Sequence, residues 1–240
     1  MHPPKPYLRG PRPLRPNSLR EQIRENIRRQ IQYGEIGPDE RLVDVEIASR
    51  LGISRVPVRE ALLQLVHEGY LVGTTRGFVL PKLSAQDISD IFEVRKLLEP
   101  RAAANAARHL SDDEAAALTA ALERARRACA ANDVNELTLA NIQFRHIWLN
   151  AEPNWRLAAT IARFADQVQV VRLGTLHDRA SQDVVVDGLA RLTEAFVRRD
   201  AAAVEALTAE FIGHAEARYF AVRAAMQTIE ERAKPARQAT

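Results

Sequence analysis

The stretch "ASRLGISRVPVREALLQL", residues 48–65, constrains the fold more than any other part of the sequence. It joins two helical patterns through a single glycine. Gly52 stands where a helix can end in a left-handed conformation, and Ser54 suits the cap of a second helix. Pro57 falls in the first turn of that helix, where its missing N–H costs nothing. Two helices joined this tightly predict a helix-turn-helix.

The flanking segments complete this motif. Ser18 and Glu21 have the spacing of a capping box and open an amphipathic helix that is expected to end near Gly34. Asp44 is the expected cap of the short helix before the turn. After the second helix, "YLV" and "FVL" are predicted to form two short strands joined by the glycine-bounded turn "GTTRG". Residues 18–81 therefore predict a winged helix-turn-helix domain.

Two arginines make the start of the second helix a candidate binding surface. Arg55 and Arg59 lie one turn apart, beside the unpaired N–H groups and the positive dipole end that also attract phosphate. A helix presented in this way can enter the major groove of DNA, where arginine forks pair with guanine edges. The alternative is that both arginines are solvated charges on the surface of a three-helix core.

The composition of the chain limits its protein class and the number of its domains. The chain has 240 residues, 46% hydrophobic and 27% charged, which fits a globular protein of two modest domains. Six of the first 16 residues are proline, so residues 1–17 are predicted to be a disordered basic arm, with a disordered tail at 233–240. A single cysteine, Cys129, excludes an internal disulfide framework. Neither a long apolar run nor a secretory signal is present, so we expect a cytoplasmic protein with no membrane partner.

The remaining residues, 82–232, show helical periodicity and no strand alternation. Ser84, Ser111, Asn154 and Asp200 are the expected caps of helices in this part. About six helices are predicted, over residues 84–109 with a bend at Pro100, 111–130, 133–150, 154–178, 182–199 and 201–231. The predicted fold class is mainly α, with an N-terminal winged helix-turn-helix domain and a C-terminal all-α helical bundle.

The first of these domains resembles a known family. The segment "IASRLGISRVPVREALLQLVHEGYL" is similar to the DNA-binding domain of GntR family transcription regulators, and the likeness covers residues 18–80. Some members carry a basic residue in the helix before the turn, where Val45 stands here. The resemblance implies operator DNA as the partner, with contacts from Ser54, Arg55, Val56, Pro57 and Arg59 on the second helix and from Arg76 and Gly77 at the wing tip.

The second domain resembles the FCD domain of the fatty-acid-regulator (FadR-like) subfamily. The likeness rests on "IFEVRKLLEPRAAANAA", "ANIQFRHIWLNAEPNWRL" and "ARLTEAFVRRDAAAVEAL", in this order behind a GntR-type head. It implies a homodimer whose helical domain binds a small effector and modulates operator binding. The predicted function is therefore a metabolite-responsive repressor, with a small organic acid as the effector.

Many members of this subfamily hold a divalent metal with one aspartate and three histidines. The corresponding positions here are Asn141, Arg145, Leu189 and Phe211, none of which is a usual ligand. His146 points away from the face of Asn141 and Arg145, whereas His214 lies nearly on the face of Phe211. We therefore expect no metal and no other cofactor, and whether His146 or His214 restores a metal site stays open.

An inward arginine offers another way to hold an anionic effector. The guanidinium of Arg145 would lie where the metal often helps to hold the effector, and its fork matches a carboxylate. The alternative is a structural ion pair, for Arg145 with a buried or rim carboxylate and for Arg95 with Glu99 at i+4. The candidate effector-binding residues are Arg95, Asn141, Arg145, Trp148, Leu189, Phe211 and His214.

The sequence contains no pattern typical of an enzyme. A glycine-rich phosphate loop, a G-x-S-x-G elbow and an H-E-x-x-H motif are all missing. A metal-dependent hydrolase on a helical bundle would need the carboxylates and histidines that the corresponding positions lack. A regulator that binds DNA without an effector, on a purely structural bundle, is the other alternative. A ligand-dependent change in DNA affinity would distinguish it.

Overall fold

The computed structural model describes residues 18–32, 34–37, 39–167, 175–176 and 178–237, with only the backbone for 165–167 and 226–237. The predicted disordered arm, residues 1–17, and the end of the predicted tail, residues 238–240, lie outside this part. Contacts between residues divide the chain into two units. One lies within residues 1–29 and 39–80, and the other within 30–38 and 81–240.

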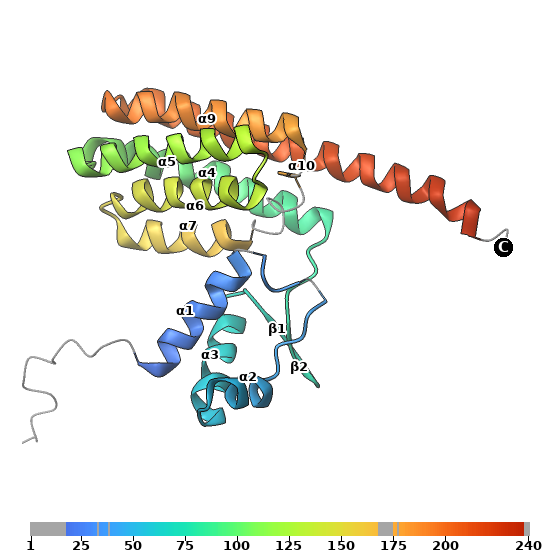
Figure 1. Cartoon of the computed structure of the whole chain (residues 1–240). Coiled ribbons are helices and arrows are strands. Elements are labelled where there is room, and N and C mark those ends of the chain that lie inside the picture. The colour runs from blue at the N-terminus through green and yellow to red at the C-terminus, as the bar shows by residue number, and fades with distance from the viewer. Residues whose placement is uncertain (1–17, 33, 38, 168–174, 177, 238–240) are drawn as a thin grey trace, which may run out of the picture. The chain divides into compact units, whose positions relative to one another are not determined.

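The first unit has the order of elements that the sequence predicts. Its helices are α1 (Leu19–Gln32), α2 (Asp44–Leu51) and α3 (Arg55–His67), and its strands are β1 (Val72–Thr74) and β2 (Gly77–Val79) (Figure 1). The strands pair antiparallel with Thr74 opposite Gly77. Gly52 ends α2 with φ 65°, the left-handed conformation that glycine adopts without strain. This unit is a winged helix-turn-helix.

The wing also pairs with the segment before α2. The N–H of Leu42 donates to the carbonyl of Phe78 at 2.8 Å, and the N–H of Phe78 donates to the carbonyl of Leu42 at 2.9 Å. Gly77 sits beside this bridge with φ 131°, and a Cβ there would lie 2.7 Å from the backbone oxygen of Leu42. Glycine is therefore required at this position because of both backbone conformation and space.

The second unit is a bundle of helices. Its members in the described part of the chain are α4 (Ala85–His109), α5 (Asp112–Ala131), α6 (Val134–Asn150), α7 (Trp155–Gln167), α9 (Arg179–Val197) and α10 (Ala201–Arg237). α10 packs against α4 and α9, α5 packs against α6 and α9, and α7 packs against α4 (Figure 1). The prediction of an all-α C-terminal domain is confirmed.

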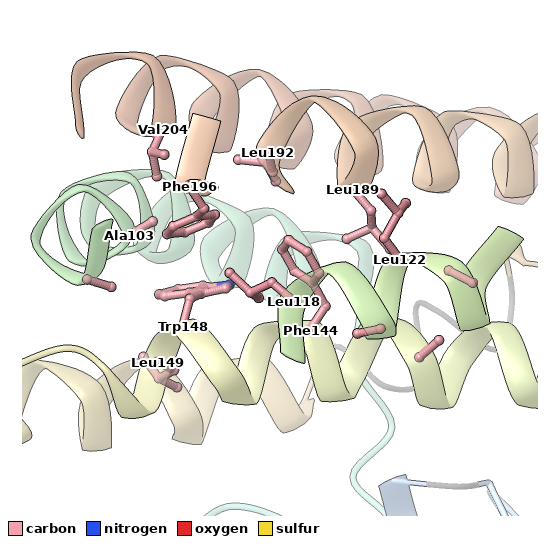
Figure 2. Packing of buried hydrophobic residues seen from close by; sticks show 14 of the residues in the cluster. Ala103, Leu118, Leu122, Phe144, Trp148, Leu149, Leu189, Leu192, Phe196 and Val204 are labelled. Carbon is pink, nitrogen blue, oxygen red and sulfur yellow. The ribbon is translucent and has the colours of Figure 1, made fainter. Parts of the chain in front are cut away.

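Apolar side chains from all six of these helices meet in the core of the bundle. Figure 2 shows Phe144 and Trp148 of α6 pointing toward Phe196 of α9, with leucines of α5 and α9 around them. The rings of Phe144 and Phe196 meet edge to face, with centroids 6.3 Å apart. Leu189 belongs to the same buried cluster.

Most of the predicted helix caps are confirmed. Ser84 and Ser111 each form a complete capping box. Asn154 accepts from the N–H of Leu157 at 3.3 Å, and Asp200 accepts from the N–H of Ala203 at 3.0 Å. These predictions hold because a cap depends on residues that are only three positions apart.

Several boundaries differ from the prediction. Asp44 is not the cap of α2: Val43 holds that position, and the Asp44 carboxylate turns to two arginines instead. The helix expected over 154–178 does not extend that far, because Asp178 accepts from the N–H of Ser181 at 2.9 Å and caps α9. Residues 168–174 and 177 lie outside the described part.

The last helix is longer than predicted. α10 runs to Arg237, past the expected end at 231 and into the predicted tail, where alanine, lysine and arginine favour a helix and Pro235 lies in the last turn. Pro100 lies inside α4, and the expected bend there stays a prediction.

Candidate functional site

The start of α3 presents a cationic surface. Four apolar residues anchor the helix with their side chains buried: Val58, Ala61, Leu62 and Leu65. Arg55, Val56 and Arg59 lie on the other side, and the exposed fraction of Val56 reaches 64%. Pro57 is partly buried in the first turn. Ser54 caps α3 with an extended backbone, although its side chain makes no capping hydrogen bond.

A buried carboxylate connects the two arginines. Oδ2 of Asp44 lies 3.0 Å from Nε of Arg55 and 3.1 Å from Nη1 of Arg59. Burial would raise the pKa of Asp44, but the hydrogen bonds from Arg55 and Arg59 hold it below its ordinary value. This contact was not predicted from the sequence. The pattern that could have predicted it is an acid at the start of one helix followed by two arginines one turn apart on the next helix.

The wing tip has a fixed turn. The hydroxyl of Thr74 donates to the carbonyl of Gly77 at 2.9 Å and accepts from the N–H of Arg76 at 3.2 Å. The side chain of Arg76 is exposed at this tip. Gly77 is partly buried and lies against the backbone of Leu42, so its place in the wing is set by backbone packing.

A second candidate site is a cavity of about 50 Å³ inside the helical domain. Four of the predicted effector-binding residues line it: Arg95, Asn141, Arg145 and Phe211. Ser181 and Arg218 also line it, and the sequence analysis did not single them out. Arg218 could have been found, because it follows Phe211 by seven residues and so lies on the same face of α10.

Glu99 joins the two arginines of this cavity. Nε of Arg95 lies 2.7 Å from Oε1 of Glu99, and Nη2 of Arg145 lies 3.3 Å from Oε2 of the same carboxylate. The exposed fractions of the three side chains are only 4%, 10% and 2% for Arg95, Arg145 and Glu99. The ion pairs foreseen as an alternative are thus present, and both arginines still line the cavity.

The other predicted effector-binding residues lie elsewhere. Trp148 and Leu189 belong to the apolar core and are not among the residues that line the cavity (Figure 2). His214 lines a neighbouring groove of about 330 Å³ together with Phe211 and Glu210. Phe211 thus borders both spaces, and its ring packs against Gly188, where a Cβ would lie 2.2 Å from it.

The residues at the family's metal-ligand positions do not fit a divalent cation. They offer one amide, one guanidinium and two apolar side chains, and Arg145 places a positive charge where the cation would lie. His146 is exposed, whereas Asn141 and Arg145 are buried. Within the described residues, no three His, Cys, Asp or Glu side chains gather as a metal site requires. The absence of a bound metal stays a prediction.

Comparison with known proteins agrees with the two units. The family "Bacterial regulatory proteins, gntR family" matches residues 19–77, and the FCD domain matches residues 90–214. The regulator McbR of Escherichia coli K12 is 33% identical over 129 residues, which are 53% of this chain and 58% of that protein. The chain thus spans less than two thirds of that relative.

Longer matches exist at lower identity. The transcriptional repressor RspR of Escherichia coli K12 is 26% identical over 78% of this chain and 82% of its own length. The solved structure of Escherichia coli McbR/YncC covers 85% of this chain and 97% of its own, with 25% identity and a TM-score of 0.75.

None of the helices in the described part of the chain is both long and apolar enough to span a bilayer.

The proteins that match are transcriptional regulators, which confirms the prediction that the chain is not an enzyme. The chain belongs to the gntR family of bacterial regulatory proteins, a family of DNA-binding transcription regulators, and its C-terminal domain is an FCD domain.

Proposed function

We propose that this regulator binds operator DNA through one recognition surface. We define this surface as Ser54, Arg55, Val56, Pro57 and Arg59 of the α3 segment with Arg76 and Gly77 of the wing. The observation that carries the proposal is the pair of half-exposed guanidinium groups at the start of α3. Arginine at the N-terminus of a helix can pair with guanine edges in the major groove or with phosphate.

Arg59→Ala tests this proposal. We expect at least a tenfold loss of affinity for the operator with an unchanged fold, because one good arginine contact to a base is worth about 1–3 kcal/mol. Binding is measured by fluorescence anisotropy on an operator selected from random duplexes with the wild-type protein. Arg126→Ala on α5, whose side chain is 50% exposed, is the matched control. Unchanged affinity of Arg59→Ala would remove α3 from the recognition surface.

The helical domain is proposed to bind a small organic acid. Arg145 and Asn141 border the cavity together, and a guanidinium next to an amide can hold a carboxylate by several hydrogen bonds. An effector that binds the DNA-incompetent arrangement more tightly would release the operator. This makes the protein a repressor, a role that the name of the related RspR also carries.

Arg145→Ala tests the effector site. A panel of small carboxylic acids is first screened by thermal shift, and each acid that stabilises the wild type is then titrated into the operator complex. We expect Arg145→Ala to bind the operator normally and to respond weakly to the acid. Arg145→Lys, which keeps a cation beside Glu99 without the fork, should respond in between. A wild-type response in both variants would exclude Arg145 from the site.

One observation favours the second candidate, a regulator without an effector. Arg95 and Arg145 already share Glu99, and the cavity between them is small. If no acid in the panel stabilises the protein or changes its operator affinity, the bundle is structural. The further expectations are a homodimer on a pseudo-palindromic operator, no bound metal and a cytoplasmic location, and these stay proposals.

A further inference from the structure

The contact between Asp44 and the recognition surface has a distinctive geometry. Asp44 is the first residue of α2, and its side chain is only 7% exposed, whereas those of Arg55 and Arg59 are 56% and 54% exposed. A single oxygen, Oδ2, lies within 3.1 Å of both guanidinium groups. A buried anion thus contacts two cations whose side chains are more than half exposed.

The atoms used in this contact matter for DNA binding. Arg55 approaches Asp44 through Nε, so the pair does not use the edge formed by its two terminal nitrogens. That edge can pair bidentately with O6 and N7 of guanine. Arg59 approaches through Nη1 and likewise keeps a second terminal nitrogen away from Asp44. The ion pairs can therefore persist while the arginines contact DNA.

Physical chemistry also opposes the loss of both pairs. A buried carboxylate that loses its partners keeps the full cost of its desolvation, so Asp44 must retain at least one arginine. A side chain that is already held in place loses less conformational entropy when it binds. The negative charge of Asp44 also repels phosphate, and this weakens binding to DNA of any sequence.

We propose that Asp44 is a positioning residue that raises the preference of this regulator for its operator over other DNA. It orients Arg55 and Arg59 in the free protein and stays paired in the operator complex. The inference rests on the proposed recognition surface. The specificity ratio, which is the affinity for the operator divided by that for a scrambled duplex, is the quantity that Asp44 controls.

The full-length Asp44→Asn variant provides the main test. We expect its operator affinity to fall about tenfold or more, within the range for the loss of one bidentate base contact. Its affinity for a scrambled duplex of equal length should stay the same or rise, because a negative charge is removed. Asp44→Glu, which restores a carboxylate, should recover most of the specificity ratio.

Glu46→Gln is the matched control. It removes one negative charge from an exposed position in the first turn of the same helix. We expect it to change both affinities in the same direction and to leave the specificity ratio as it is in the wild type. Thermal unfolding of each variant, followed by circular dichroism, shows whether the fold is kept.

A second measurement needs no variant at position 44. In ¹⁵N-labelled wild type, the Nε–H signal of Arg55, assigned with Arg55→Lys, should be protected from solvent exchange both before and after the operator is added. Loss of protection in the complex would mean that Arg55 leaves Asp44 to bind DNA, and this would overturn the proposal.

Other results of these binding experiments would overturn either the role of Asp44 or the recognition surface itself. If Asp44→Asn binds the operator more tightly, Asp44 only competes with DNA. If both affinities fall together with thermal stability, Asp44 only supports the fold. Either result overturns the inference. If Arg55→Ala and Arg59→Ala bind the operator normally, the recognition surface itself is wrong. If these two lose binding and Asp44→Asn does not, only the role of Asp44 fails.

Discussion

Asp44 connects the acid stability of the winged helix-turn-helix to its two arginines. Burial would raise the pKa of Asp44, but hydrogen bonds from Arg55 and Arg59 lower it below the ordinary value near 3.8. A group whose pKa is lowered by folding stabilises the fold above its unfolded pKa, and this contribution is lost as the pH falls through the folded pKa.

The first prediction concerns Asp44→Asn and pH. The difference in unfolding free energy between wild type and variant should be constant from about pH 5 to 7 and should shrink as the pH falls below about 4, because the unfolded chain takes up a proton there before the folded protein does. Urea unfolding at a series of pH values measures it. A difference that stays constant from about pH 5 down to about pH 2, or that grows as the pH falls, would contradict the ion pair as the source of this stability.

The second prediction concerns Glu99, whose buried carboxylate is shared by Arg95 and Arg145. Glu99→Gln leaves two buried cations without their counter-ion, and loss of one partner of a buried pair costs about 3–5 kcal/mol. Urea unfolding of the helical domain measures this cost.

The control for Glu99 is Glu205→Gln. Glu205 pairs with Arg101 at 3.9 Å, and both side chains are exposed, so this variant should lose less than about 1 kcal/mol. Equal losses in the two variants would show that burial does not set the strength of the Glu99 pairs.

At the scale of elements, the wing depends on the space beside Gly77. The third prediction is that Gly77→Ala destabilises the DNA-binding domain by about 1–3 kcal/mol, since the positive φ is strained for alanine and its Cβ would meet the Leu42 oxygen at 2.7 Å. Gly73→Ala in β1 is the control, because a Cβ there meets nothing within 4 Å. Equal stability of the two variants would refute the close approach.

Elements were predictable from the sequence where their signals are local. Ser84 and Ser111 cap their helices through residues three positions later, and Gly52 ends α2 by its own conformation. Asp44 was assigned wrongly because a local rule was applied to a side chain with distant partners. The predicted helix end at 178 was also wrong, although the cap that Asp178 provides to α9 through Ser181 is a local signal.

At the scale of the molecule, the two ion pairs of Glu99 at the cavity differ in the same way. One joins residues that are close in the sequence, and the other joins residues from distant helices. The pair of Arg95 with Glu99 has a spacing of four residues, so the sequence could suggest it. Arg145 reaches Glu99 from another helix, and only the packing of α6 on α4 brings them together. Single-sequence patterns place residues on faces, whereas a cavity depends on which faces meet.

The fourth prediction concerns the proposed homodimer. Two recognition helices related by a two-fold axis must reach half-sites about one helical turn apart on the same face of DNA. An insertion of about 5 bp, which is half a turn, places the half-sites on opposite faces, so the affinity should fall to that of a single half-site. Substitution of the same spacer positions without insertion is the control, and sedimentation gives the number of chains per operator. One chain per operator, or an affinity that the insertion leaves unchanged, would contradict a dimer that reads both half-sites at once.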